Sequence, residues 1–214
     1  MKKIITCIGI RPDIIRLSQI IKKFDQYFDN IVVDSGQHYD YNLNKIFYDQ
    51  LGVRAPDYNL DIKSGSHAEQ VGRLMIAFEK TLQKEQPDFV VVLGDNNSSL
   101  GFALATSKLN IPLVHIEAGM RSKNWEMPEE KNRIIIDHIA DMNICYLEEH
   151  QQNLIREGLN PRRTWVVGNP IIEVVHAVKP EFSQKESFYL VTCHRAENIE
   201  KPENLKRILD FLGK

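Results

Sequence analysis

Short apolar runs rich in Val, Ile and Leu alternate along the chain with longer segments in which apolar residues recur at helical spacing. The runs predict strands at 3–8, 30–35, 89–93, 113–116, 142–145, 164–167 and 188–193. The helical patterns predict helices at 14–24, 42–51, 67–85, 98–109, 130–140, 148–157, 171–178 and 204–211. Strands that are apolar throughout are typical of a parallel sheet covered on both faces. The pattern therefore predicts an α/β fold, with a Rossmann-like parallel sheet between two layers of helices.

A linker is predicted at residues 179–186, because this segment is polar, contains Pro180 and separates a short helix from a new strand. It divides the chain into an N-terminal Rossmann-like domain, residues 1–178, and a second domain at 187–214. The second domain holds one predicted strand and one predicted helix, and a single βα unit cannot bury both of its faces. We therefore expect the second domain to be cut short.

Composition excludes several classes of protein. The 214 residues are 43% hydrophobic and 26% charged, which is typical of a soluble globular protein. A formal charge of -2 gives no reason to expect nucleic acid or an anionic membrane as a partner. The apolar start at 4–8 is too short for a membrane span or a signal peptide. Cys7, Cys145 and Cys193 are odd in number and widely spaced, which indicates reduced thiols in a cytoplasmic protein, with neither disulfides nor a metal site.

Ligands of open parallel sheets bind beyond the carboxyl ends of the strands, so the residues that follow each predicted strand are the candidates for chemistry. Gly9 and Arg11 follow the first strand, and Pro12 is suited to start the next helix. A helix N-terminus with an arginine predicts an anion site. The alternative is an ordinary turn with a solvated arginine. Gln37 and His38 follow the second strand and are expected at the same edge, or in a simple loop.

Three carboxylates are predicted to meet at this edge. Asp95 follows the strand 89–93, with Ser98 as the expected N-cap of the next helix, Glu117 follows 113–116, and Glu129 opens a helix. Each has a structural alternative: Asp95 as a turn former, Glu117 as an ion-pair partner of Arg121, and Glu129 as a complement to the helix dipole. Closely placed carboxylates shift one another's pKa and can supply acid and base roles.

His194 and Arg195 follow the last predicted strand. Such a pair could neutralise a diphosphate, although a lone His-Arg pair is more often solvated surface.

Seven motifs in order resemble the non-hydrolysing UDP-N-acetylglucosamine 2-epimerase family. They are Gly-Ile-Arg-Pro-Asp-Ile-Ile-Arg at 9–16, Gly-Gln-His at 36–38, Gly-Asp at 94–95, His-Ile-Glu-Ala-Gly-Met-Arg at 115–121, Pro-Glu-Glu-Lys-Asn-Arg at 128–133, Gly-Asn at 168–169 and His-Arg-Ala-Glu-Asn at 194–198.

The resemblance implies a two-domain GT-B type fold, with the active site between the domains and UDP held mainly by the C-terminal domain. It implies a UDP-sugar substrate, no cofactor and a homodimer of longer chains. Its catalytic residues would be Asp95, Glu117 and Glu129. Its substrate-binding residues would be Arg11, Arg16, Gln37, His38, Arg121, Arg133, His194 and Arg195.

The motifs also depart from the family pattern. Ile10, Asp13 and Arg16 stand where the family usually has Thr, Glu and Lys, and Asn96 and Asn97 stand where it usually has two threonines. Asp is a shorter carboxylate and Arg a different cation, so we expect contacts to the substrate to be rearranged. The run 11–18 is closer to the branch that epimerises 6-deoxy-talosamine sugars on the way to UDP-N-acetyl-L-fucosamine.

The activity implied is 2-epimerisation of UDP-N-acetylglucosamine, or of a UDP-6-deoxy-N-acetylhexosamine, for surface polysaccharide precursors. The reaction would eliminate UDP and add it back through a glycal. Alternatives are a GT-B glycosyltransferase, a hydrolysing epimerase and an inactive nucleotide-sugar-binding protein. We expect residues 1–214 to be inactive alone, because most of the UDP site would be missing.

Overall fold

The computed structural model describes residues 1–36, 41–63, 65–178, 189–193 and 201–213. Contacts within the chain divide it into two compact units, Met1–Lys179 and Pro180–Lys214. The first unit contains the sheet and every residue discussed below whose side chain is described. The linker and domain limits expected from the sequence stay predictions, since much of that region lies outside the described residues.

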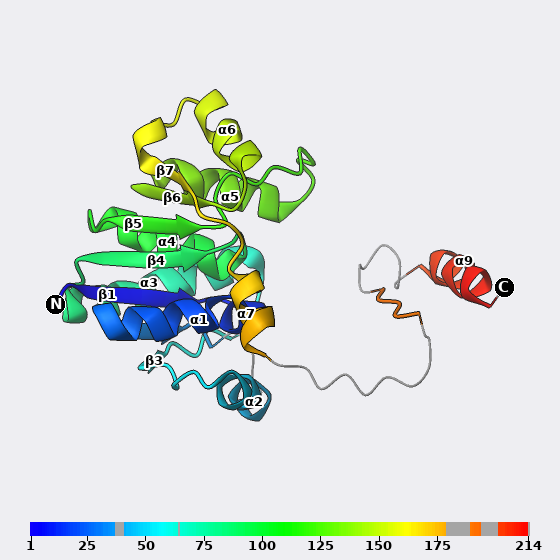
Figure 1. The fold of residues 1–214 in the computed structure, drawn as a ribbon, viewed down its shortest axis with the longest axis horizontal. Helices are drawn as coiled ribbons and strands as arrows, with labels where there is room; N and C mark the ends of the chain where they lie inside the picture. Colours follow the sequence, from blue (N-terminus) through cyan, green and yellow to red (C-terminus); the bar gives the residue numbers. More distant parts are fainter. Residues whose placement is uncertain (37–40, 64, 179–188, 194–200, 214) are drawn as a thin grey trace. The chain divides into compact units, whose positions relative to one another are not determined.

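The first unit is built on a seven-stranded sheet in the order β3-β2-β1-β4-β5-β6-β7, with every neighbouring pair parallel (Figure 1). The strands are β1 Lys3–Ile8, β2 Asp29–Asp34, β3 Tyr58–Asn59, β4 Phe89–Leu93, β5 Leu113–Ile116, β6 Met142–Cys145 and β7 Thr164–Val166. Strand β1 lies between β2 and β4. The strands up to β3 are added toward one edge of the sheet, and the strands from β4 onward are added toward the other edge. Loops on either side of such a reversal diverge, which is where ligands bind in open α/β sheets.

Helices cover both faces of this sheet. Those of the first unit are α1 Arg11–Tyr27, α2 Tyr41–Leu51, α3 His67–Glu85, α4 Asn97–Lys108, α5 Pro128–Ile139, α6 Glu148–Arg156 and α7 Ile171–Ala177, with a 3-10 turn η1 at Pro161–Arg163. Val90 and Val92 of β4 pack in one apolar cluster with α3, α4 and α5, whereas Val91 and Leu93 pack in another with α1. Successive strand residues point to opposite faces, so this alternation requires a sheet buried on both sides. The predicted α/β sheet is confirmed.

Two strand predictions differ from the structure. Strand β3 was not predicted, because two residues are too few to show a period; it exists because Tyr58 and Asn59 pair with Val33 and Asp34 of β2. The strand predicted at 188–193 does not form over its described residues 189–193. A strand is stabilised by hydrogen bonds to a neighbouring strand, and an apolar sequence alone does not provide that neighbour. The helix predicted after it is present as α9, Pro202–Leu212.

None of the described helices is long and apolar enough to cross a membrane.

Candidate functional site

The candidate site lies at the carboxyl edge of four adjacent strands. The loop after β1 leads into α1 with Asp13 and Arg16, and Asp95 and Glu117 follow β4 and β5. Tyr146 comes directly after β6, the next strand along. Parallel topology therefore places one polar group after each strand in turn.

Glu117 has an unusual backbone conformation. Its φ is +75°, in the left-handed region that non-glycine residues seldom adopt, at a cost of about 1–3 kcal/mol. The amides of Glu117 and Ala118 both donate to the Ile144 carbonyl of β6, each at 3.1 Å, and so hold this turn in place. Strain of this kind is concentrated at functional sites.

The ion-pair partner of Glu117 is Arg16, and the alternative pairing with Arg121 is wrong. The Arg16 guanidinium donates to one Glu117 oxygen and, at 2.9 Å, to Asp13. Both members of the Arg16–Glu117 pair are mostly buried, with side chains 23% and 14% exposed. Arg16 is thus the cation that sits against a predicted catalytic carboxylate.

Asp13 connects the loop after β1 with the loop after β4. Its carboxylate is 1% exposed and accepts from the Gly9 and Ile10 amides at 3.1 and 3.0 Å and from the Asn96 side chain at 3.2 Å. Burial raises the pKa of Asp13, although the Arg16 charge and the amide bonds oppose this. Glycine is needed at position 9, since a Cβ there would lie 2.5 Å from the Asn96 amide oxygen. The expectation that Asp13 changes the contacts to the substrate stays a prediction; in this structure its hydrogen bonds go to protein groups.

Asn96 also caps the helix after β4. Its side-chain oxygen accepts from the Ser99 amide at 2.9 Å, so the predicted cap at Ser98 is wrong. Asn and Ser are comparable cap residues, and sequence alone did not separate them. The Asn96 amide group that reaches Asp13 ties the cap to the loop after β1.

Asp95 is the carboxylate whose pKa is changed by the charged side chains around it. Its pKa is raised, first by burial and then by the nearby charges of Glu117 and Glu129, while Arg133 opposes the shift by an ion pair. Asn132 donates to the Asp95 backbone carbonyl at 2.9 Å. The first turns of α5 therefore bring Glu129, Asn132 and Arg133 to the end of β4. Glu117 and Glu129 are both near enough to Asp95 for their charges to act on it, which agrees with the predicted convergence of the three carboxylates.

Arg121 belongs to a separate buried network. Its guanidinium donates to Asp137 at 2.7 Å and to Glu157 at 2.6 and 2.7 Å. The ring of His115 joins Asp137 at 2.8 Å to the Gly94 carbonyl at 2.9 Å. Burial alone would raise the pKa of Asp137, but the bonds and charges of His115 and Arg121 outweigh it and lower that pKa. This network holds the Gly94 carbonyl, directly before Asp95, and ties His115 and Arg121, on the two sides of Glu117, to Asp137.

Replacing Arg121 by Met should lower the free energy of unfolding by about 3–5 kcal/mol, because the buried Asp137 carboxylate loses the guanidinium that pairs with it at 2.7 Å. Urea unfolding would measure the loss. Arg54→Met is the matched control: Arg54 also bridges two carboxylates, Asp25 and Asp57, but is 36% exposed, so its loss should cost about 1 kcal/mol or less. Equal losses for the two variants would contradict this assignment.

The remaining predicted binding residues are placed as follows. Arg11 is the first residue of α1, and its guanidinium lies 5.9 Å from the centre of the Phe47 ring. Arg133 pairs with Asp95 and, at 3.2 Å, with Glu130. Gln37, His38, His194 and Arg195 lie outside the described residues.

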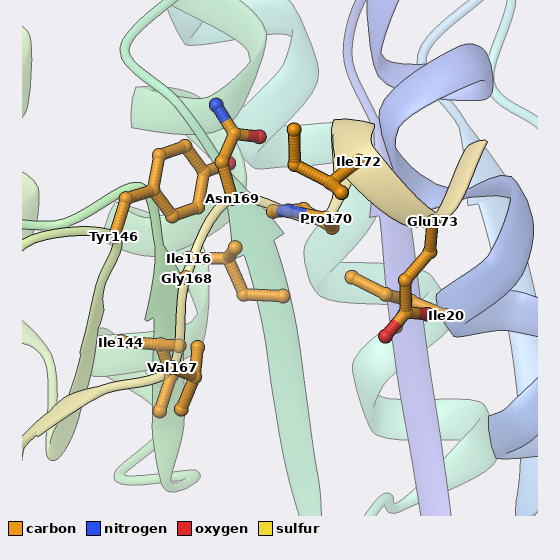
Figure 2. A pocket seen from close by; sticks show the side chains of 10 residues that line it. All are labelled: Ile20, Ile116, Ile144, Tyr146, Val167, Gly168, Asn169, Pro170, Ile172 and Glu173. Carbon is orange, nitrogen blue, oxygen red and sulfur yellow. The ribbon is translucent and has the colours of Figure 1, made fainter. Parts of the chain in front are cut away.

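A pocket of about 460 Å³ lies on the face of the sheet covered by α1, and Ile116, the residue before Glu117, is part of its lining. Ile116, Ile144 and Tyr146 form one side, and Figure 2 shows Ile20, Ile172 and Glu173 on the other. The Gly168-Asn169-Pro170 loop before α7 lines it as well. Tyr146 was not among the predicted site residues. Its position directly after a strand, like those of Asp95 and Glu117, is the signal that would have found it.

In the described ranges no group of three or more His, Cys, Asp or Glu side chains is placed to hold a metal ion. Cys7 and Cys145, both described and buried, are free thiols.

A family model described as UDP-N-acetylglucosamine 2-epimerase matches residues 22–214. The chain belongs to this family. The UDP-N-acetylglucosamine 2-epimerase of Methanocaldococcus jannaschii is 40% identical over 222 residues, covering 97% of this chain and 61% of that protein. The UDP-2,3-diacetamido-2,3-dideoxy-D-glucuronate 2-epimerase of Pseudomonas aeruginosa is 40% identical over 221 residues, covering 99% and 62%. The chain thus spans about three fifths of the length of these epimerase relatives.

The structure agrees with the family. The M. jannaschii UDP-GlcNAc 2-epimerase, solved in complex with UDP-GlcNAc and UDP, superposes with a TM-score of 0.88 at 42% identity and covers 97% of this chain and 61% of that one. The parallel sheet with its helices therefore matches epimerase structures of the GT-B type. The resemblance drawn from the motifs is confirmed.

Proposed function

We propose that the complete protein is a non-hydrolysing 2-epimerase of a UDP-2-acetamido sugar, with UDP-N-acetylglucosamine as the first candidate substrate. The observation that supports this most directly is the convergence of Asp95, Glu117 and Glu129 at one sheet edge, where the neighbouring charges act on Asp95. Relatives that act on differently substituted sugars, such as the P. aeruginosa epimerase, support the class of substrate more than any one member of it. The 6-deoxy sugar stays the second candidate, on the strength of the run 11–18.

The chemistry requires both a base and an acid. The proton on C2 is not adjacent to a carbonyl, so direct removal faces a high barrier. If a carboxylate takes this proton while the C1–O bond breaks, UDP leaves with the bonding electrons and a C1=C2 double bond forms. Addition of UDP to C1, with protonation of C2 on the other face, gives the epimer. A set of three carboxylates can provide both proton transfers.

Cations would stabilise the leaving diphosphate. Arg11 and Arg16 lie in the first two turns of α1, whose N-terminus favours anions. His194 and Arg195 are proposed to act from the second domain, and Arg133 to hold Asp95 in place. We propose further that the complete protein is a cytoplasmic homodimer that serves surface polysaccharide synthesis.

Incubation of the complete protein with UDP-N-acetylglucosamine in heavy water tests this function. We expect the 2-epimer to appear, with deuterium at C2 of both sugars, by NMR. The UDP-6-deoxy-N-acetylhexosamine is the second arm of the experiment. Absence of exchange and of epimer with both substrates would contradict the proposal. Free UDP without an acceptor would indicate a hydrolysing epimerase instead, and sugar transferred to an acceptor would indicate a glycosyltransferase.

A further inference from the structure

Tyr146 is a buried phenol whose hydroxyl makes no hydrogen bond of full geometry within the described ranges. The residue is 4% exposed, and its hydroxyl oxygen is enclosed without a hydrogen-bond partner among the described residues. Buried polar atoms are nearly always paired, so an unpaired hydroxyl calls for an explanation. Phenylalanine would fill the same space without the unpaired group.

The surroundings of the hydroxyl are charged on one side and apolar on the other. Glu117, Arg16 and Asp13 all interact with it electrostatically, and burial followed by the Glu117 charge raises the pKa of Tyr146. A contact with the Glu117 carboxylate contributes to this rise, so the two groups are near each other, but the hydroxyl makes no hydrogen bond of full geometry among the described residues. The Tyr146 ring meanwhile forms part of the pocket wall (Figure 2).

Glu117 has room for another donor. Arg16 donates to its Oε2, and no hydrogen bond to its Oε1 is present among the described residues. An ionised carboxylate can accept several hydrogen bonds. Arg16 is also a proposed contact of the anionic substrate, and a guanidinium that turns toward a phosphate loses its bond to Glu117.

We propose that Tyr146 is a positioning residue for Glu117, and that its hydroxyl donates to the Glu117 carboxylate when substrate draws Arg16 away. The bond would hold the Glu117 side chain in its reactive orientation while the substrate is bound. This inference rests on the proposed epimerase function, because it assigns Glu117 to that reaction.

Tyr146→Phe in the complete protein tests this role, since it removes the hydroxyl alone. We expect kcat for epimerisation to fall about 10- to 100-fold, the range for one hydrogen bond to a charged group. The KM should stay within about threefold, because the bond is made to a protein side chain rather than to the sugar. The rate of deuterium incorporation at C2 should fall in parallel with kcat. The midpoint of urea unfolding should change little, because the hydroxyl has no hydrogen bond of full geometry to lose in the substrate-free protein.

Tyr58→Phe is the matched control. The Tyr58 hydroxyl bonds to Glu85 and to Lys84, residues that precede β4 and therefore lie toward the opposite edge of the sheet. This variant should lower the unfolding midpoint and leave kcat unchanged.

The outcomes separate the two proposals. An active wild-type protein combined with an unchanged kcat in Tyr146→Phe would overturn the role of Tyr146 alone. A rise confined to KM, or a stability loss as large as that of Tyr58→Phe, would overturn it too. A wild-type protein inactive on every UDP-sugar tested would instead overturn the proposed function and, with it, the basis of this inference.

Discussion

Replacing Glu117 by Gln in the complete enzyme is expected to lower kcat by about 10²- to 10⁴-fold while the protein remains folded. Gln keeps the size and shape of the side chain but cannot accept a proton from C2 or return one. The fold should tolerate the change, because the Arg16 guanidinium retains its bond to Asp13 at 2.9 Å. The backbone at φ +75° is held by the amide bonds to Ile144, which do not involve the side chain.

Separation of the two UDP-sugars by chromatography would measure kcat, and circular dichroism would test the fold. Glu79→Gln makes the same substitution at an exposed position of α3 and should leave turnover unchanged. If Glu117→Gln retained turnover within about threefold of wild type, Glu117 would leave the set of catalytic residues. If it lost activity together with its native spectrum, the Arg16–Glu117 pair would be structural.

Much of the fold could be predicted because its strands are buried on both faces. A fully buried strand appears as an unbroken apolar run, such as 89–93, and the structure has β4 at Phe89–Leu93. Strand β3 could not be found this way, since it depends on the edge of β2 and not on a pattern of its own. The run at 188–193 shows the converse: an apolar sequence does not become a strand over 189–193 without a neighbour to pair with.

The convergence of Glu117 and Glu129 on Asp95 could be predicted because parallel topology brings strand ends together. Their partners could not, since pairing depends on three-dimensional approach. Arg16 and Glu117 are 101 positions apart. Arg121 is only four positions from Glu117, yet it turns to Asp137 on α5 and to Glu157 at the end of α6. Nearness in sequence was misleading, because the turn at Glu117 points the two side chains to different partners.

Asp95→Asn should also lower kcat about 10²- to 10⁴-fold, but its effect on stability should be small and dependent on pH. A raised pKa means that the ionised carboxylate is less favourable in the folded protein than in the unfolded chain. The contribution of Asp95 to stability therefore increases as pH falls through its folded pKa and decreases as pH rises. Asn removes this dependence. The free energy of unfolding of the variant should therefore be nearest to that of wild type at neutral pH and should fall below it in mild acid.

Arg133 limits the structural cost of this change. It loses the charge of Asp95 but keeps Glu130 at 3.2 Å, and burial already disfavours the ionised form of Asp95, so we expect the free energy of unfolding at neutral pH to change by about 1 kcal/mol or less. Urea unfolding at the two pH values and chromatographic assay of epimerisation would measure both effects. Asp88→Asn, just before the start of β4, is the control, because Asp88 pairs with Lys2 at the other edge and should not affect kcat. A loss of several kcal/mol in Asp95→Asn would show instead that Asp95 anchors Arg133 for folding, and Glu117 and Glu129 would then be left to carry both proton transfers.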